Sequence, residues 1–133
     1  MVDIDIVYEG NLKCRVRHRP SGVEIRTAAP VDNQGDGSSF SPSDLVASAL
    51  GACMAMVMGI VARRHAIDLA GLTVHVAKEM SADAPRRIAR LPVTITFPSH
   101  VTAEQRQLLE RAALTCPVHH SIRPDIDAPV AFR

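Results

Sequence analysis

One uncharged segment constrains the fold of this chain more than any other feature. Residues 45–62, LVASALGACMAMVMGIVA, form a run of eighteen residues without a charge. Its length reaches the lower limit for a membrane span. The run is nevertheless rich in Ala, Gly and Ser, and it lies between stretches that alternate apolar and polar residues as a soluble sheet does. We therefore predict a buried helix in a soluble protein rather than a membrane-spanning one.

A helix formed by this run needs more packing partners than a chain of this length is expected to provide. A helix that is apolar on every side must be covered on every side. The chain has 133 residues, which is the size of one domain, so we expect a single domain over residues 1–133. Packing against the same helix of a second copy would complete the cover, and we therefore expect a homodimer. Gly51, Ala55 and Gly59 recur at every fourth position and would let two helix backbones approach closely.

The segments around this helix predict an α+β fold with the element order βββ-α-ββ-α-α-β. The long helix should begin at Pro42, with Ser41 as its cap, and end near Arg64. TAEQ at 102–105 matches a capping box for a second helix, and Pro117 would begin a short third one. Alternating apolar and polar residues predict the strands. The expected strands are 2–8, 12–18, 23–27, 72–76, 91–97 and 129–132.

Charge and aromatic content argue against nucleic acid as a partner. Fifteen Lys and Arg are matched by fourteen Asp and Glu, and the chain has no Trp, one Tyr and three Phe. Such a chain has no basic excess for a phosphate backbone and few aromatic rings on which bases could stack. We expect neither nucleic acid nor a membrane as a partner.

The three cysteines are the main candidates for chemistry. Their odd number, the lack of a CxxC pair and the lack of a signal-peptide pattern in residues 1–10 predict free thiols in the cytoplasm. Cys14 lies on the apolar face of a predicted strand and is expected to pack there. Cys53 lies in the apolar helix. Cys116 directly precedes the short helix, where free N–H groups favour a thiolate, and His119 and His120 follow within one turn.

From the residues alone, Cys53 and Cys116 admit several interpretations. If the fold brings them together, one thiolate could attack a peroxide and become a sulfenic acid, and the second thiol could condense with it to a disulfide. The same thiols with His119 and His120 could instead bind a metal, although no zinc-site spacing is present. A Ser-His-Asp hydrolase lacks support because no nucleophile-elbow motif occurs. The cysteines could also only line a cleft of a non-catalytic module that binds an apolar small molecule.

Two motifs resemble the OsmC/Ohr family of osmotically inducible and organic hydroperoxide resistance proteins. SPSDLVASALGACM at 41–54 is similar to the family signature around its first cysteine, and TCPVH at 115–119 is similar to that around its second. The resemblance covers essentially the whole chain, including APVDN at 29–33. It implies a two-layer fold and an intertwined homodimer with sites at the subunit interface. It also implies Cys53 as the peroxidatic thiol and Cys116 as the resolving one, organic hydroperoxides as substrates, an external dithiol as reductant, and no metal, haem or flavin.

The sequence departs from the peroxidases of that family at two supporting positions. Ser43 stands where those members carry a Glu, and Asp44 is its acidic neighbour. Asn11 lies near the place of an Arg that orients this Glu and stabilises the thiolate, while Arg15 lies further along the same strand. Arg15, Asp44 and His119 are therefore the candidate supporting residues. In these departures the chain is most similar to OsmC-like members whose substrate is undefined.

Overall fold

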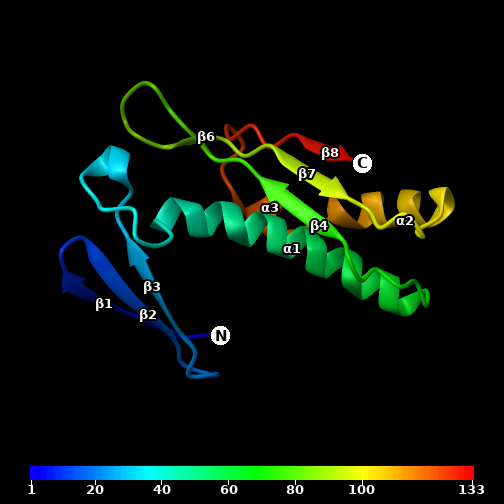
Figure 1. The fold of residues 1–133 in the computed structure, drawn as a ribbon, viewed down its shortest axis with the longest axis horizontal. Coiled ribbons are helices and arrows are strands. Elements are labelled where there is room, and N and C mark those ends of the chain that lie inside the picture. The colour runs from blue at the N-terminus through cyan, green and yellow to red at the C-terminus, as the bar shows by residue number, and fades with distance from the viewer. The chain divides into compact units, whose positions relative to one another are not determined.

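The computed structural model describes residues 1–133, which divide into two compact units, Met1–Val46 and Ala47–Arg133. The N-terminal unit contains one antiparallel sheet with the strand order β1-β2-β3, followed by the short 3-10 helix η1 (Figure 1). Its elements are β1 (Ile4–Gly10), β2 (Lys13–His18), β3 (Glu24–Ala28) and η1 (Val31–Asn33). All three strands were predicted from the alternation of apolar and polar residues.

The two faces of this first sheet differ in chemistry. The register pairs Ile6 with Val16, and Val16 with Ile25, so these three apolar residues share one face. That face also carries Ile4 and Tyr8, and in the single chain it is largely exposed, with Ile6 at 65% and Tyr8 at 63%. Charged residues form the opposite face. Within the N-terminal unit, the first sheet thus presents an open apolar face.

Helix α1 (Pro42–Arg64) begins where the sequence predicts. The Ser41 N–H donates to Asp44 Oδ2 at 2.8 Å, and the Asp44 N–H donates to Ser41 Oγ at 3.2 Å. These reciprocal bonds satisfy two backbone groups that a helix start otherwise leaves unpaired. Ser41 is buried, so the cap also anchors the loop that leads into the helix.

Only one side of α1 is buried in the protomer. The buried residues fall on a single stripe of the helix: Ala47, Leu50, Gly51, Met54, Met58 and Ala62. Met56 and Ile60 lie on the opposite side and are 65% and 53% exposed. By length and composition α1 could cross a membrane, but core helices of soluble proteins pass the same test. Within the C-terminal unit, the side of α1 that carries Met56 and Ile60 is therefore left open.

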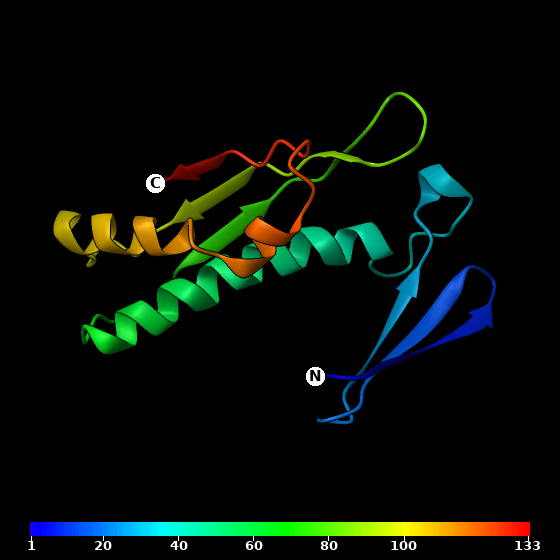
Figure 2. The same ribbon diagram turned by 180° about the vertical axis from the view of Figure 1, so that it is seen from behind.

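In the C-terminal unit, helices lie against one face of a second sheet. The strand order is β4-β7-β8, antiparallel between β4 and β7 and parallel between β7 and β8. Helices α1, α2 and α3 lie on the same side of this sheet, which gives the two layers expected (Figure 2). The elements are β4 (Thr73–Val76), β7 (Val93–Thr96), α2 (Ala103–Ala113), α3 (Pro117–Ser121) and β8 (Val130–Phe132). Leu91, Ile95 and Leu109 are fully buried between the layers.

Gly51 lets α1 approach this sheet closely. A Cβ at Gly51 would lie 2.8 Å from Val76 Cγ2 and 3.3 Å from Val74 Cγ1, whereas a Cβ at Gly59 would meet nothing within 4 Å. The expectation that Gly51 serves the approach of a second copy of the helix is therefore wrong, because strand β4 of the same chain already fills that place.

The structure contains a hairpin that the sequence pattern did not reveal. Strands β5 (Glu79–Met80) and β6 (Ile88–Arg90) pair in the segment that was expected to be a turn between two longer strands. Arg90 binds Glu79 across the pair at 3.0 Å and Asp127 at 2.7 Å. Strands this short show no recognisable alternation, and cross-strand ion pairs stabilise them instead.

Candidate functional site

The structure brings Cys53 and Cys116 together within the C-terminal unit. Cys53 lies on α1 and is half-buried, whereas Cys116 lies between α2 and α3 and is fully buried. The Cys53 side chain lies close enough to Cys116 to raise the pKa of that thiol. Both thiols are free, as is that of Cys14. Two cysteines that are distant in the sequence are thus neighbours in the fold.

Burial raises the pKa of the Cys116 thiol, and its contact with Cys53 raises it further. Cys116 is the N-cap residue of α3, and the N–H groups of His119 and Val118 act in the opposite direction. The thiol makes no capping hydrogen bond of ordinary geometry, so these N–H groups act on it mainly as nearby dipoles. The N–H groups at the start of α3 lower the pKa of Cys116 as predicted, but burial raises it by more. The thiolate expected at Cys116 is therefore disfavoured, and the neutral thiol is favoured.

The two histidines that follow Cys116 belong to α3. Their rings lie edge to face with centroids 5.9 Å apart. The His120 N–H donates to the carbonyl oxygen of Cys116 at 3.2 Å, which fixes the backbone that carries the thiol. No group of three or more His, Cys, Asp or Glu is placed to hold a metal ion. The hypothesis of a metal site at Cys53, Cys116, His119 and His120 thus gains no support from the geometry.

The candidate supporting residues Asp44 and Arg15 both have partners in the N-terminal unit. The carboxylate of Asp44 accepts the Ser41 N–H in the cap of α1. Arg15 Nη1 donates to Glu24 Oε1 at 3.1 Å, and its Nε lies 3.7 Å from Glu9 Oε2. These contacts account for the positions of both charged side chains.

Cys14 occupies the strand position predicted for it. It pairs with Tyr8 on one side and Thr27 on the other, on the apolar face of the first sheet. Its side chain is half-buried. It belongs to the N-terminal unit, whereas Cys53 and Cys116 belong to the other.

Comparison with known proteins identifies the family. The family model described as OsmC-like protein matches residues 35–130, which is most of the chain. The chain belongs to the OsmC-like protein family. A Psychrobacter arcticus protein, named as a candidate osmotic stress induced and detoxification response protein, is 44% identical, with all of this chain and 96% of that one aligned and a TM-score of 0.93. No curated protein sequence matches the chain.

More distant solved structures share the OsmC-like fold. The organic hydroperoxide resistance protein OsmC of Legionella pneumophila is 18% identical, with 99% of this chain and 96% of that one aligned and a TM-score of 0.78. The organic hydroperoxide resistance protein OhrB of Bacillus subtilis is 16% identical, with 100% and 98% aligned and a TM-score of 0.73. These likenesses concern the fold, and they confirm the OsmC-like α+β architecture expected from the sequence.

Proposed function

We propose that this OsmC-like protein reduces organic hydroperoxides with Cys53 and Cys116 as a redox pair. The observation that carries the proposal is the proximity of the two thiols, which the fold brings together from α1 and the start of α3. Membership of the family supports it, and so do the names of the structural neighbours from Legionella pneumophila and Bacillus subtilis, both organic hydroperoxide resistance proteins. A pair of thiols in contact can pass from dithiol to disulfide with little movement of the backbone.

Exposure supports an assignment of the two roles. Cys53 is half-buried on α1, so a peroxide can reach its sulfur from solvent, whereas Cys116 has no exposed surface. Cys53 is therefore the peroxidatic residue and Cys116 the resolving one. Burial of a resolving thiol also protects it from direct oxidation.

The reaction takes place in three balanced steps. The Cys53 thiolate attacks one oxygen of the hydroperoxide, the O–O bond breaks, and with one proton the products are a Cys53 sulfenic acid and an alcohol. The Cys116 thiol then attacks the Cys53 sulfur, a disulfide forms and water leaves. An external dithiol finally reduces the disulfide to two thiols and becomes a disulfide itself.

Because the thiolate is the nucleophile, the raised pKa of Cys116 means that its thiol must lose its proton as it attacks in the second of these steps. A thiol that keeps its proton until attack supplies that proton to the departing hydroxyl group, which leaves as water. The N–H groups of His119 and Val118 lie near the sulfur and would stabilise negative charge as it develops there. His119 thus enters the proposal through its backbone. Arg15 remains a candidate supporting residue, and Asp44 acts through the start of α1.

The most direct test follows the thiols during oxidation. One equivalent of cumene hydroperoxide per chain is expected to lower the number of titratable thiols from three to one. Peptide mapping under non-reducing conditions should then show the Cys53 peptide linked to the Cys116 peptide, with Cys14 still free. Three remaining thiols after exposure to peroxide would exclude the redox pair and favour a module that only binds small molecules. Three free cysteines also fit a reducing compartment such as the cytoplasm, which is where we place the reaction.

A homodimer is part of the proposal, because it would cover the open side of α1. We expect Met56→Asp to shift the mass from twice 14.4 kDa to 14.4 kDa in light scattering, since a buried unpaired carboxylate costs several kcal/mol. The control is Leu114→Asp, which puts the same charge on an exposed apolar residue outside α1. It should leave the dimer intact. A wild-type monomer, or a dimer that tolerates Met56→Asp, would contradict the use of this face.

A further inference from the structure

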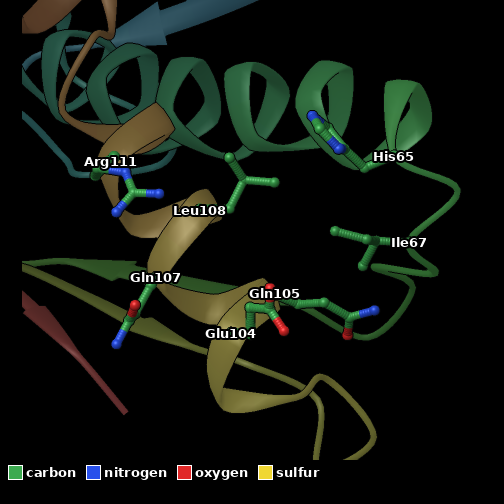
Figure 3. Close-up of a pocket in the computed structure, with 7 residues that line it drawn as sticks. All are labelled: His65, Ile67, Glu104, Gln105, Gln107, Leu108 and Arg111. Carbon is green, nitrogen blue, oxygen red and sulfur yellow. The ribbon is translucent and has the colours of Figure 1, made fainter.

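A concave site is lined by residues other than the cysteine pair. It is a hollow of about 470 Å³, open to solvent, between the end of α1 and one face of α2 (Figure 3). Its volume is within the range of small-molecule sites. His65 at its rim is about 18 Å from Cys53 along the axis of α1. The His65 end of the hollow is therefore distant from Cys53, and neither Cys53 nor Cys116 lines the hollow.

The turn that ends α1 builds one wall of the hollow. The Ile67 N–H donates to the Ala62 carbonyl at 2.9 Å, and the Ala66 N–H donates to the Arg63 carbonyl at 3.3 Å. This pairing closes the helix with Ala66 in the left-handed region, at φ 52°. As a result His65 stays exposed at the rim, while Ile67, at 9% exposed, forms part of an apolar floor. Figure 3 shows both residues opposite the side chains of α2.

Helix α2 supplies the other wall, along which an acidic, an apolar and a basic residue follow one another. Glu104, Leu108 and Arg111 recur at helical spacing, so they share one face. Leu108 lies in the middle and adds to the apolar floor beside Ile67. The Gln105 side-chain oxygen is already used, since it accepts the Thr102 N–H at 3.0 Å in the capping box of α2. That leaves the Gln105 amide group as a donor toward the hollow.

The donors that surround the floor are not used by the protein. Neither the Arg111 guanidinium nor the His65 ring makes a hydrogen bond or an ion pair within the chain. Arg90, by contrast, binds two carboxylates. A guanidinium fork matches the two oxygens of a carboxylate. Glu104 lies two helical turns away from Arg111 and repels negative charge from the other end.

We propose that this hollow binds a small amphiphilic carboxylate. Its carboxylate lies on Arg111, and its apolar chain covers Leu108 and Ile67 toward the His65 end of the hollow. Glu104 fixes the orientation, because the negative group of the ligand is accepted only at the Arg111 end. Nothing in the apolar pattern of the sequence indicates this site, because α1 and α2 contribute residues that the fold alone brings together.

The experiment titrates the full chain with octanoate and follows backbone amide signals by NMR. Shifts are expected at residues 65–67 and 104–111, and octanamide, which has the same chain without the charge, should bind at least about tenfold more weakly. Arg111→Gln should raise the Kd for octanoate about tenfold, while Glu104→Gln should leave it unchanged or lower it. Arg63→Gln is the matched control, because it removes an exposed cation that does not line the hollow, and it should have no effect.

Several results would overturn the proposal. These are the absence of shifts at millimolar octanoate, shifts centred on other surfaces, equal binding of octanamide, or an equal Kd for Arg111→Gln and the wild type. The Cys53→Ser variant should bind octanoate with the wild-type Kd. Loss of peroxide reduction and loss of this site can therefore be observed independently.

Discussion

Replacing Cys53 with Ser is expected to lower the rate of cumene hydroperoxide reduction by about three orders of magnitude, to the uncatalysed level. A serine hydroxyl has nearly the same size as a thiol, but it does not ionise near neutral pH and cannot form a sulfenic acid. The measurement is the loss of hydroperoxide over time with dithiothreitol as the reductant. Cys14→Ser is the matched control, because it makes the same change outside the proposed redox pair, and it should retain the wild-type rate. Equal rates for Cys53→Ser and the wild type would refute the mechanism.

Cys116→Ser is expected to allow the attack of Cys53 on the peroxide but to block the formation of the disulfide. Cys53 can still attack the peroxide, so one equivalent of hydroperoxide should be consumed per chain. The proposed resolving thiol is absent, so a Cys53 sulfenic acid should accumulate and react with dimedone. Mass spectrometry of the labelled peptide gives the position of the adduct. Dimedone found on another residue, or an unchanged disulfide, would reassign the roles of the two cysteines.

Elements that depend on neighbours in the chain were predictable from the sequence. The cap of α1 uses Ser41 and Asp44, and that of α2 uses Thr102 and Gln105, so each pair lies within one helical turn. The strands of the first sheet were also predictable, because successive side chains of a strand point to opposite faces and therefore alternate between apolar and polar. The cysteine motifs were also local, and with the order of the elements they were sufficient to indicate the family.

Features that depend on residues distant in the chain could not be predicted in this way. The expectation of a thiolate at Cys116 rested on the helix start alone, whereas the extent of burial is set by α1, α2 and the sheet together. The hairpin of β5 and β6 depends on Arg90, whose partner Asp127 lies far along the chain. Gly51 was assigned to a second copy because its spacing matched Gly59. Only the fold shows that Val76 of the same chain fills the space beside it.

The contact between Gly51 and Val76 predicts the largest effect on stability. Gly51→Val is expected to lower the free energy of unfolding by about 3 kcal/mol, because the added carbons would overlap β4 and neither packed layer can move away without strain. This loss is a large share of the stability of a small domain, which is about 5–15 kcal/mol. The measurement is chemical denaturation at fixed protein concentration, which keeps any contribution of a dimer constant.

A double-mutant cycle shows whether Val76 causes that loss. Gly51→Ala places a Cβ 2.8 Å from Val76 Cγ2, which costs about 1–3 kcal/mol of overpacking against a gain of about 1 kcal/mol in helix propensity. In a Val76→Ala background the obstructing methyl groups are gone, and the same Gly51→Ala change should stabilise the protein by about 1 kcal/mol. A reversal of sign between the two backgrounds assigns the close approach of α1 and β4 to this pair. The same effect in both backgrounds would mean that the helix backbone, and not the contact with β4, requires glycine at position 51.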